Sequence, residues 1–147
     1  MARTIVEVMT IGKTPDEIQE FLDQWFSQNR FVVRDWYSDG APFTVYDQWS
    51  ILGIRVSPNA GSIVAAKFDG GWIVFEINMR KESNGTLFHG EFYVAGWDLI
   101  KGVEIDLEHG SLAMLTRQKG YAVMTKLFRQ LEDFSGPFPK DELPKLL

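Results

Sequence analysis

The sequence predicts an α+β fold in which a curved antiparallel sheet packs against a long C-terminal helix. Three observations predict it: a strand-like segment near the N-terminus leads into a capped helix, alternating segments joined by tight turns follow, and a long amphipathic segment comes last. The chain has 147 residues and no internal repeat. Since domains typically have roughly 150 residues, we expect residues 1–147 to form a single domain.

The first strand and the first helix have the clearest signals. Residues 3–11 alternate as a strand with one face on a core does, and Gly12 ends the alternation. Thr14 then serves as the N-cap, Pro15 stands at the first helical position, and Glu17 completes a capping box. Apolar residues recur at helical spacing over residues 15–28, where we expect one helix: Ile18, Phe21, Leu22, Trp25 and Phe26.

Turn signals divide the middle of the chain into an antiparallel meander. Asp-Gly and Asn-Gly pairs separate segments that alternate with a period of two residues. The expected strands cover residues 31–38, 43–56, 62–68, 72–82, 86–96 and 99–108. In the fourth of these, Phe75 and Ile77 lie on an apolar face. The alternate positions, Glu76, Asn78 and Arg80, form a polar face. In the 99–108 strand, Glu104, Asp106 and Glu108 form a polar face in the same way, opposite Val103, Ile105 and Leu107, so we expect a half-buried sheet.

A second helix is expected over residues 111–134, before the stop signal Gly136-Pro137 and a Pro-rich tail, 136–147. At 1.5 Å per residue it would be about 36 Å long, enough to lie along the sheet. Its apolar face is formed by Ala113, Gly120, Met124, Leu127, Phe128 and Leu131, flanked by Tyr121, Val123 and Phe134.

This order of elements resembles the helix-grip fold of the START/Bet v1-like (SRPBCC) superfamily, with its polyketide cyclase-like, coenzyme Q-binding and plant-allergen branches. The segment IGKTPDEIQEFLDQWF resembles the opening of that family, and SLAMLTRQKGYAVMTKLFRQLEDF resembles its closing helix. The resemblance covers nearly the whole chain and is one of architecture, without a catalytic motif. It implies a β-α-β6-α order, a curved sheet wrapped on the C-terminal helix, and a ligand cavity between them. The family usually has two short helices after its first strand, where this chain has one.

Composition and charge exclude several functions. Lys and Arg number 15 against 20 Asp and Glu, so the formal net charge of −5 opposes nucleic-acid binding. With no Cys and two His, we expect no metal site and no cofactor. No segment approaches the roughly 20 apolar residues of a membrane span. We therefore expect a cytoplasmic protein, monomeric or homodimeric, with no nucleic-acid partner.

Arg117 is the most informative candidate for a ligand contact. It falls inside the apolar face of the second helix, and Gly120 leaves room beside it. One interpretation is that Arg117 holds the polar head of a ligand whose apolar part lies over Gly120 and Met124. The other is that the helix overhangs the sheet and Arg117 reaches water. The candidate ligand-binding residues are Arg117, Gly120, Tyr121, Met124, Asp35, Asp47, Trp49, Phe75 and Ile77.

Two carboxylates interrupt apolar alternations, Asp35 in the 31–38 strand and Asp47 in the 43–56 strand. If these faces point inward, each carboxylate is a partner for Arg117 or for a ligand hydroxyl. The alternative is that both lie on the surface near strand ends.

The 86–96 strand carries a possible acid–base pair. His89 and Glu91 share one face, opposite Phe88 and Phe92. The pair would serve proton transfer if it faced a cavity. The alternative is that the two Phe side chains point inward and His89 is solvated.

The leading hypothesis is binding, for transport or sensing, of a hydrophobic or amphipathic molecule such as a lipid, isoprenoid or aromatic polyketide-like compound. A first alternative is a cyclase, dehydratase or hydrolase that uses the same cavity, with Asp35, Asp47 or His89 as general acid or base. A second is an interaction module with a filled core that acts through an exposed apolar patch or the 136–147 tail. The fold alone does not decide among them.

Overall fold

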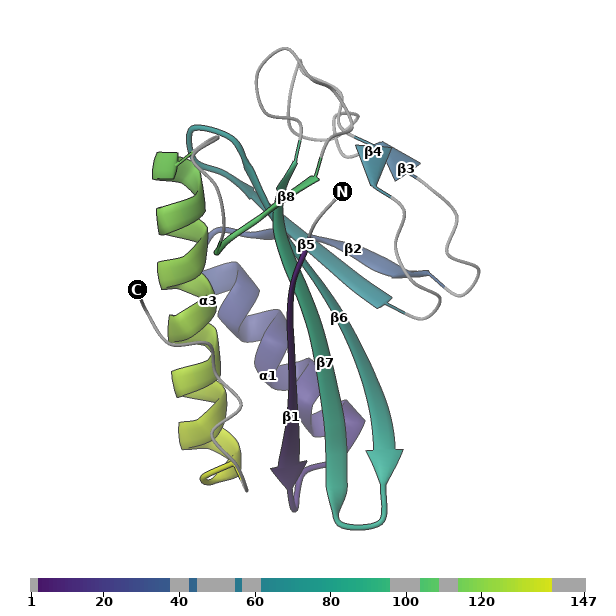
Figure 1. Cartoon of the computed structure of the whole chain (residues 1–147). Coiled ribbons are helices and arrows are strands. Elements are labelled where there is room, and N and C mark those ends of the chain that lie inside the picture. Colours follow the sequence, from purple (N-terminus) through teal and green to yellow (C-terminus); the bar gives the residue numbers. More distant parts are fainter. Residues whose placement is uncertain are drawn as a thin grey trace.

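The computed structural model describes residues 3–37, 43–44, 55–56, 62–95, 104–108 and 114–138; for 34–37, 43–44 and 55–56 it describes the backbone. These residues form an α+β fold with a curved antiparallel sheet of six strands and two helices, one of them C-terminal (Figure 1). The elements in chain order are β1 (Thr4–Ile11), α1 (Pro15–Gln28), β2 (Val32–Tyr37), β3 (Phe43–Thr44), β4 (Arg55–Val56), β5 (Ser62–Phe68), β6 (Trp72–Glu82), β7 (Gly85–Ala95), β8 (Glu104–Asp106) and α3 (Met114–Ser135).

The six-stranded sheet has the order β1-β7-β6-β5-β2, and β8 also pairs with β7. Strands β5, β6 and β7 form the expected meander, and every strand pair is antiparallel. Thr4 of β1 pairs with Phe92 of β7, and Asp106 of β8 pairs with the next residue, Tyr93. Strands β1 and β8 therefore follow one another along one edge of β7. The backbone N–H of Leu107 joins them by donating to Thr4 Oγ1 at 2.9 Å.

The segment predicted as one strand over residues 43–56 is not one strand, and this prediction is wrong. Phe43 pairs with Val56 and Thr44 with Arg55, so the two ends of the segment pair with each other as β3 and β4. They form a separate two-stranded sheet. The alternation of apolar residues in this segment carried no turn signal strong enough to show the reversal.

Helix α1 begins at the predicted capping box and has the predicted bounds. Thr14 Oγ1 accepts a hydrogen bond from the Glu17 backbone N–H at 3.2 Å, and Glu17 Oε1 accepts one from the Thr14 N–H at 3.0 Å. These bonds satisfy two donors that the first helical turn would otherwise leave unpaired. The helix then buries Ile18, Leu22, Trp25 and Phe26, four of the five residues predicted for its apolar stripe.

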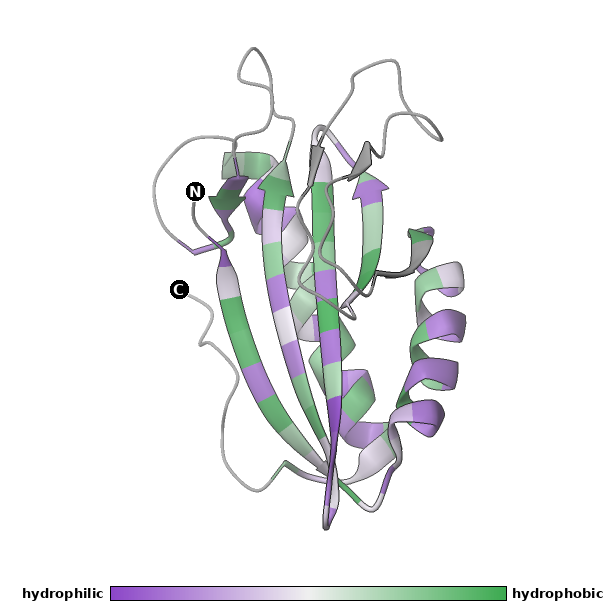
Figure 2. Ribbon diagram, turned by 90° about the vertical axis from the view of Figure 1, so that its right-hand side faces the viewer, coloured by the Kyte–Doolittle hydropathy of each residue, from purple (hydrophilic) through white to green (hydrophobic). Residues whose placement is uncertain are grey.

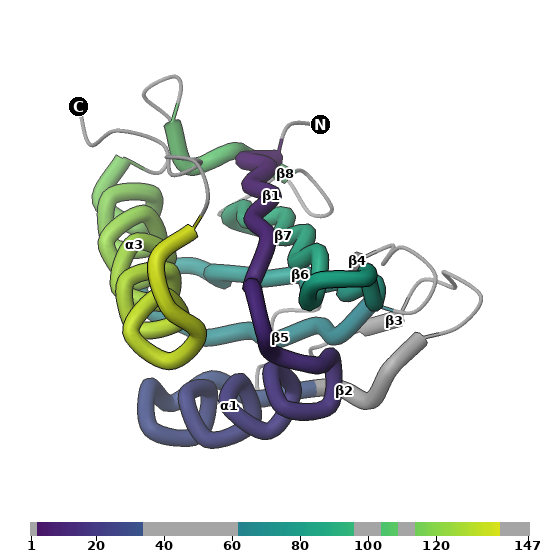
Figure 3. The backbone as a smooth tube through the Cα atoms, turned by 90° about the horizontal axis from the view of Figure 1, so that it is seen from below, coloured from purple at the N-terminus to yellow at the C-terminus, as the bar shows by residue number. Residues whose placement is uncertain are grey.

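Helix α3 lies beside α1 on the same core (Figure 3). Trp25 Nε1 donates a hydrogen bond to Gln130 Oε1, and Phe21 stacks on Phe134, so the two helices are in contact. The predicted stop is confirmed, because α3 ends at Ser135 and Gly136 adopts a left-handed φ of 91°. The buried residues of α3 are Thr116, Arg117, Gly120, Tyr121, Met124, Leu127, Phe128 and Leu131.

The sheet has a buried cluster on each face. The inner cluster, under the helices, is rich in aromatic residues, among them Trp25, Phe26, Phe31, Phe75, Phe88, Phe92 and Phe128. The outer cluster consists of Val64, Ala66, Trp72, Val74, Tyr93 and Ala95. Hydrophobic and hydrophilic residues alternate along the strands (Figure 2).

The prediction that Glu76, Asn78 and Arg80 form a solvent-facing side of β6 is wrong for Glu76. Glu76 is 1% exposed, and Trp72 and Val74 before it are buried as well. Only from Asn78 onward does this face reach solvent, and Arg80 is exposed. Alternation shows which residues share a face, but it does not show which part of that face is covered.

We expect Gly85→Ala to destabilise the fold by about 2 to 3 kcal/mol, because the added carbon would overlap the neighbouring backbone. A Cβ at this position would lie 1.9 Å from the Thr10 carbonyl oxygen, which belongs to the paired strand β1. Urea denaturation measures the effect.

The matched control is Gly12→Ala at the same end of the sheet, where Gly12 N–H donates to Asn84 O. A Cβ there meets nothing within 4 Å, so only its φ of +79° opposes the change, at about 1 kcal/mol. Equal losses in the two variants would contradict the close approach of β1 and β7.

Candidate functional site

Arg117 is buried inside the fold, with 4% of its surface exposed. The interpretation in which it reaches water is therefore wrong. Its Nε donates to the Asp106 carbonyl at 2.8 Å, and its Nη2 lies 3.9 Å from Asp106 Oδ1. Asp106 is thus a described partner of Arg117, although the alternation in the 99–108 strand had placed it with Glu104 on a solvated face. The predicted partners are not tested, because Asp47, Trp49 and the side chain of Asp35 lie outside the described residues.

The space beside Gly120 is occupied. A Cβ on Gly120 would lie 3.1 Å from Leu107 Cδ2 and 3.5 Å from Ile73 Cγ2. The room that the sequence suggested next to Arg117 is thus taken by side chains of β6 and of the residue that follows β8. The missing side chain of Gly120 allows Leu107 to pack directly on the helix backbone.

Tyr121 carries a buried hydroxyl group that has no hydrogen-bond partner among the described residues. The residue is 7% exposed and lies one helical turn after Arg117. Burial raises the pKa of this hydroxyl, and the negative charge of Glu108 raises it further. A buried hydroxyl without a partner costs about 1 to 3 kcal/mol, so the Tyr121 group needs a water molecule or a ligand to satisfy it.

The three remaining described candidates, Met124, Phe75 and Ile77, lie in the inner apolar cluster. All three are almost completely buried. The structure thus places Arg117, Gly120, Tyr121 and Met124 along the buried side of α3, facing the same core as Phe75 and Ile77 of β6.

An ionic cluster that the sequence analysis missed lies on the outer face of the sheet. Its centre is Arg3, whose Nη1 lies 2.9 Å from Glu76 Oε2 and 3.0 Å from Glu91 Oε1. Arg3 also binds Glu104 with two hydrogen bonds, from Nε at 2.7 Å and from Nη2 at 2.8 Å. The guanidinium lies over the ring of Tyr93, whose hydroxyl donates to Glu76 Oε2 at 2.5 Å.

Burial and neighbouring charges determine the ionisation states of Arg3 and Tyr93 in this cluster. Burial lowers the pKa of Arg3, but the hydrogen bond to Glu104 and the charges of Glu76 and Glu104 outweigh burial, so its pKa is raised. Burial and the neighbouring charge of Glu76 raise the pKa of Tyr93. Tyr93 therefore remains a neutral hydrogen-bond donor, and Arg3 remains a cation. The acidic residues of the 72–82 and 99–108 strands were the available signal, but the periodicity had placed them in water.

His89 extends the cluster toward the surface. Its Nδ1 lies 2.8 Å from Glu7 Oε2 and its Nε2 lies 2.7 Å from Glu91 Oε2. Only an imidazolium, with a proton on each nitrogen, can donate to both carboxylates. Of the two alternatives for this strand, the one in which Phe88 and Phe92 point inward is confirmed, since both are fully buried under the helices.

The proton of His89 is stabilised by its neighbours. Burial lowers the pKa of His89, but the hydrogen bonds and charges of Glu91 and Glu7 outweigh burial, so its pKa is raised. Conversely, burial raises the pKa of Glu91, but bonds from His89 and Arg3 outweigh it, so the pKa of this carboxyl group is lowered.

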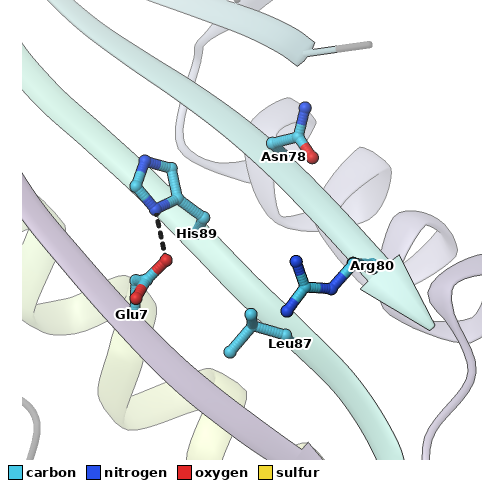
Figure 4. Close-up of a pocket in the computed structure, with 5 residues that line it drawn as sticks. All are labelled: Glu7, Asn78, Arg80, Leu87 and His89. Carbon is cyan, nitrogen blue, oxygen red and sulfur yellow. Dashed lines mark hydrogen bonds and ion pairs between the residues drawn. The ribbon is translucent and has the colours of Figure 1, made fainter. Parts of the chain in front are cut away.

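A shallow hollow of about 220 Å³ lies beside His89 on the outer face (Figure 4). It is lined by Glu7, Asn78, Arg80, Leu87 and His89. Of the acid–base pair suggested by the sequence, His89 lines this hollow and Glu91 does not, and the hollow lies on the face opposite the helices. Both ring nitrogens of His89 are already hydrogen-bonded, so neither is directly available to a substrate.

Comparisons with known proteins assign no family to the chain. No family model matches it, and no curated protein and no solved structure matches it either. Among the described helices, neither is long and apolar enough to cross a membrane. The functional argument therefore depends on the residues of the chain itself.

We expect the free energy of unfolding to fall as the pH rises through the folded-state pKa of His89. The folded state binds this proton more tightly than the unfolded state, so the contribution is complete below the unfolded pKa of about 6.5 and is lost above the raised folded pKa. Urea denaturation between about pH 6 and about pH 9 measures this decline.

The variant His89→Gln should remove this part of the decline and cost about 1 kcal/mol at the acidic end, a figure reduced by solvent screening. The other histidine supplies the matched control, because His109→Gln leaves the bonds of His89 in place. A decline that persists unchanged in His89→Gln would show that the imidazolium does not stabilise the fold.

Proposed function

We propose that the chain is a helix-grip protein of the START/Bet v1-like type that binds a hydrophobic or amphipathic small molecule between α3 and the sheet. In this proposal Arg117 and Tyr121 contact the polar end of the ligand, and Met124, Phe75 and Ile77 belong to the apolar lining. Two features of the fold support it: the order of the elements, and the position of α1 and α3 on one core against a curved antiparallel sheet.

The observation that carries the proposal is the unpartnered hydroxyl group of Tyr121. The surroundings of this part of α3 are apolar, since Gly120 packs against Leu107 and Ile73. Arg117, one turn before Tyr121, is a second buried polar side chain on the same helix. Two buried polar side chains beside the apolar packing at Gly120 are an arrangement that can orient a ligand in a small-molecule site.

The chemistry of these two groups favours a ligand with an oxygen acceptor at one end. A guanidinium group donates only, whereas a tyrosine hydroxyl donates and accepts. A carboxylate, carbonyl or hydroxyl head attached to a hydrocarbon or aromatic body meets both requirements. Lipids, isoprenoids and aromatic polyketide-like compounds have this form.

The enzyme alternative has weaker support. His89 is the one acid–base candidate whose side chain is described, and its two nitrogens are occupied by Glu7 and Glu91. A reaction there would first require one of these carboxylates to release the ring. The interaction-module alternative, by contrast, predicts a core that no small molecule enters, which the following experiments test directly.

We expect Tyr121→Phe to stabilise the ligand-free protein by about 1 kcal/mol, because it removes a buried hydroxyl that has no partner. The same variant should bind anilinonaphthalene sulfonate, an anionic amphipathic probe, about fivefold more weakly, equivalent to about 1 kcal/mol. Urea denaturation and probe fluorescence provide the two measurements.

Tyr93→Phe is the matched control, because the Tyr93 hydroxyl is hydrogen-bonded to Glu76 and its loss should destabilise the fold. If Tyr121→Phe also destabilises the fold and the wild-type protein binds no probe, the proposal is wrong and the interaction-module alternative gains support.

We expect Arg117→Met to weaken binding of the anionic probe by about tenfold, since about 1.4 kcal/mol is a modest value for a lost charge-assisted contact. Binding of phenylnaphthylamine, which is neutral, should change much less. Fluorescence titration of both probes gives the comparison. Equal weakening of the two probes would place Arg117 in the structural framework and not at the head of the ligand.

A further inference from the structure

A short segment, residues 104–108, joins the outer ionic cluster to the proposed ligand site. Glu104 faces Arg3 on the outer side of the sheet. Asp106 and Leu107 face α3, through the contacts with Arg117 and Gly120. We call residues 104–108 the β8 segment, and it contacts both sites.

On the outer side of the sheet, an ion pair attaches the β8 segment to Arg3. The two parallel hydrogen bonds between Arg3 and Glu104 have the bidentate geometry that makes such pairs strong and directional. The backbone attachment of β8 is short, because β8 pairs with β7 over three residues, Glu104, Ile105 and Asp106. The pair between Arg3 and Glu104 is therefore a principal attachment of the β8 segment.

On the inner side, residues of the β8 segment cover the proposed ligand site. The side chain of Leu107 occupies the space next to Gly120, and the carbonyl of Asp106 accepts a hydrogen bond from Arg117 Nε. These are the positions that a ligand head and the first part of its apolar body would take. The backbone of Leu107 is fixed by its hydrogen bond to Thr4 Oγ1.

The charge balance around Arg3 lowers the cost of releasing the β8 segment. Arg3 has three carboxylate neighbours, so it keeps Glu76 and Glu91 when Glu104 leaves. The released Glu104 regains water, and no buried cation is left without a partner. A single ion pair of the same burial would not open as readily, because opening would leave Arg3 alone.

We propose, on the basis of the proposed function, that the β8 segment is a latch over the ligand site. In the closed state Arg3 holds Glu104, and Leu107 fills the space over Gly120. In the open state the β8 segment moves away from α3, which gives a ligand access to Arg117, Gly120 and Tyr121.

The experiment uses the exchange rate of the Leu107 amide proton, followed by NMR in the full chain. In Glu104→Gln the Arg3 pair loses its charge, so we expect this amide to exchange about tenfold faster, equivalent to about 1.4 kcal/mol. Phenylnaphthylamine should also associate about tenfold faster in stopped-flow measurements. The amide of Phe75 in the centre of the sheet should not change, which separates local opening from unfolding.

Glu91→Gln is the matched control. It removes the same charge from the surroundings of Arg3 but leaves the pair between Arg3 and Glu104 intact. We expect no acceleration of Leu107 exchange or of probe association in this variant.

The outcomes separate the latch from the function on which it rests. Unchanged Leu107 exchange in Glu104→Gln, or equal acceleration in Glu91→Gln, overturns the latch even if the wild-type protein binds the probe. If the Leu107 amide exchanges faster but the probe associates at an unchanged rate, the proposal that the ligand enters by opening of the β8 segment is wrong. Faster exchange in a protein that binds no probe overturns the proposed function, and the latch then has no ligand site to cover.

Discussion

The N-terminal and C-terminal parts of the chain meet on one edge of β7, and the rest of the structure depends on this shared edge. β1 pairs with the stretch of β7 up to Phe92, and β8 takes the three residues that follow. Neither strand can shift along β7 without displacing the other. Arg3 and Glu104, 101 positions apart, close the junction on the outer face, and Thr4 and Leu107 close it within the sheet. Because α1 follows β1 and α3 follows β8, this junction also brings together the chain segments that lead into both helices.

Local signals in the sequence predicted the helices and most strands well. They did not predict contacts between residues that are far apart in the sequence. The capping box at Thr14 and the apolar spacing that follows it are sufficient to predict α1. The hydrogen bonds that start the helix join residues only three positions apart in the sequence. The stop of α3 at Gly136 is local in the same sense.

Glu76 and Asp106 show the limit of such reasoning. Each alternates with apolar residues and was assigned to water, but Glu76 is covered and Asp106 meets Arg117, and neither partner lies nearby in sequence. The inward position of Arg117 was predictable from helical periodicity, and the side chain that fills the space beside it was not.

The two faces of the sheet bury polar groups in different ways. On the outer face, each hydrogen-bonding group of the Arg3 cluster meets a complementary one: guanidinium with carboxylate, Tyr93 with Glu76, and His89 with two carboxylates. The raised pKa of Arg3 and of His89 shows that the local field favours their charged forms. The inner face lacks such completion at Tyr121, whose hydroxyl stays without a partner among the described residues. A satisfied cluster stabilises one structure, whereas an unsatisfied buried group favours any state that provides a partner. This contrast supports a structural role for the outer cluster and is the basis of the binding role that we propose for the inner site.

A binding site that is filled by a side chain of its own protein is consistent with ligand binding, but it sets a condition on affinity. If the ligand binds only the form in which Leu107 has left Gly120, the apparent dissociation constant equals the intrinsic one divided by the open fraction. An interaction that holds Leu107 in place therefore weakens binding and, by the same factor, keeps the apolar interior closed when no ligand is present. The ion pair between Arg3 and Glu104 is suited to this balance, since it adds to the strand pairing with β7 and to the packing of Leu107 from the outer side of the sheet. In the proposed latch, the affinity of the inner site is thus adjusted from the outer face of the sheet, through a contact that the ligand itself never touches.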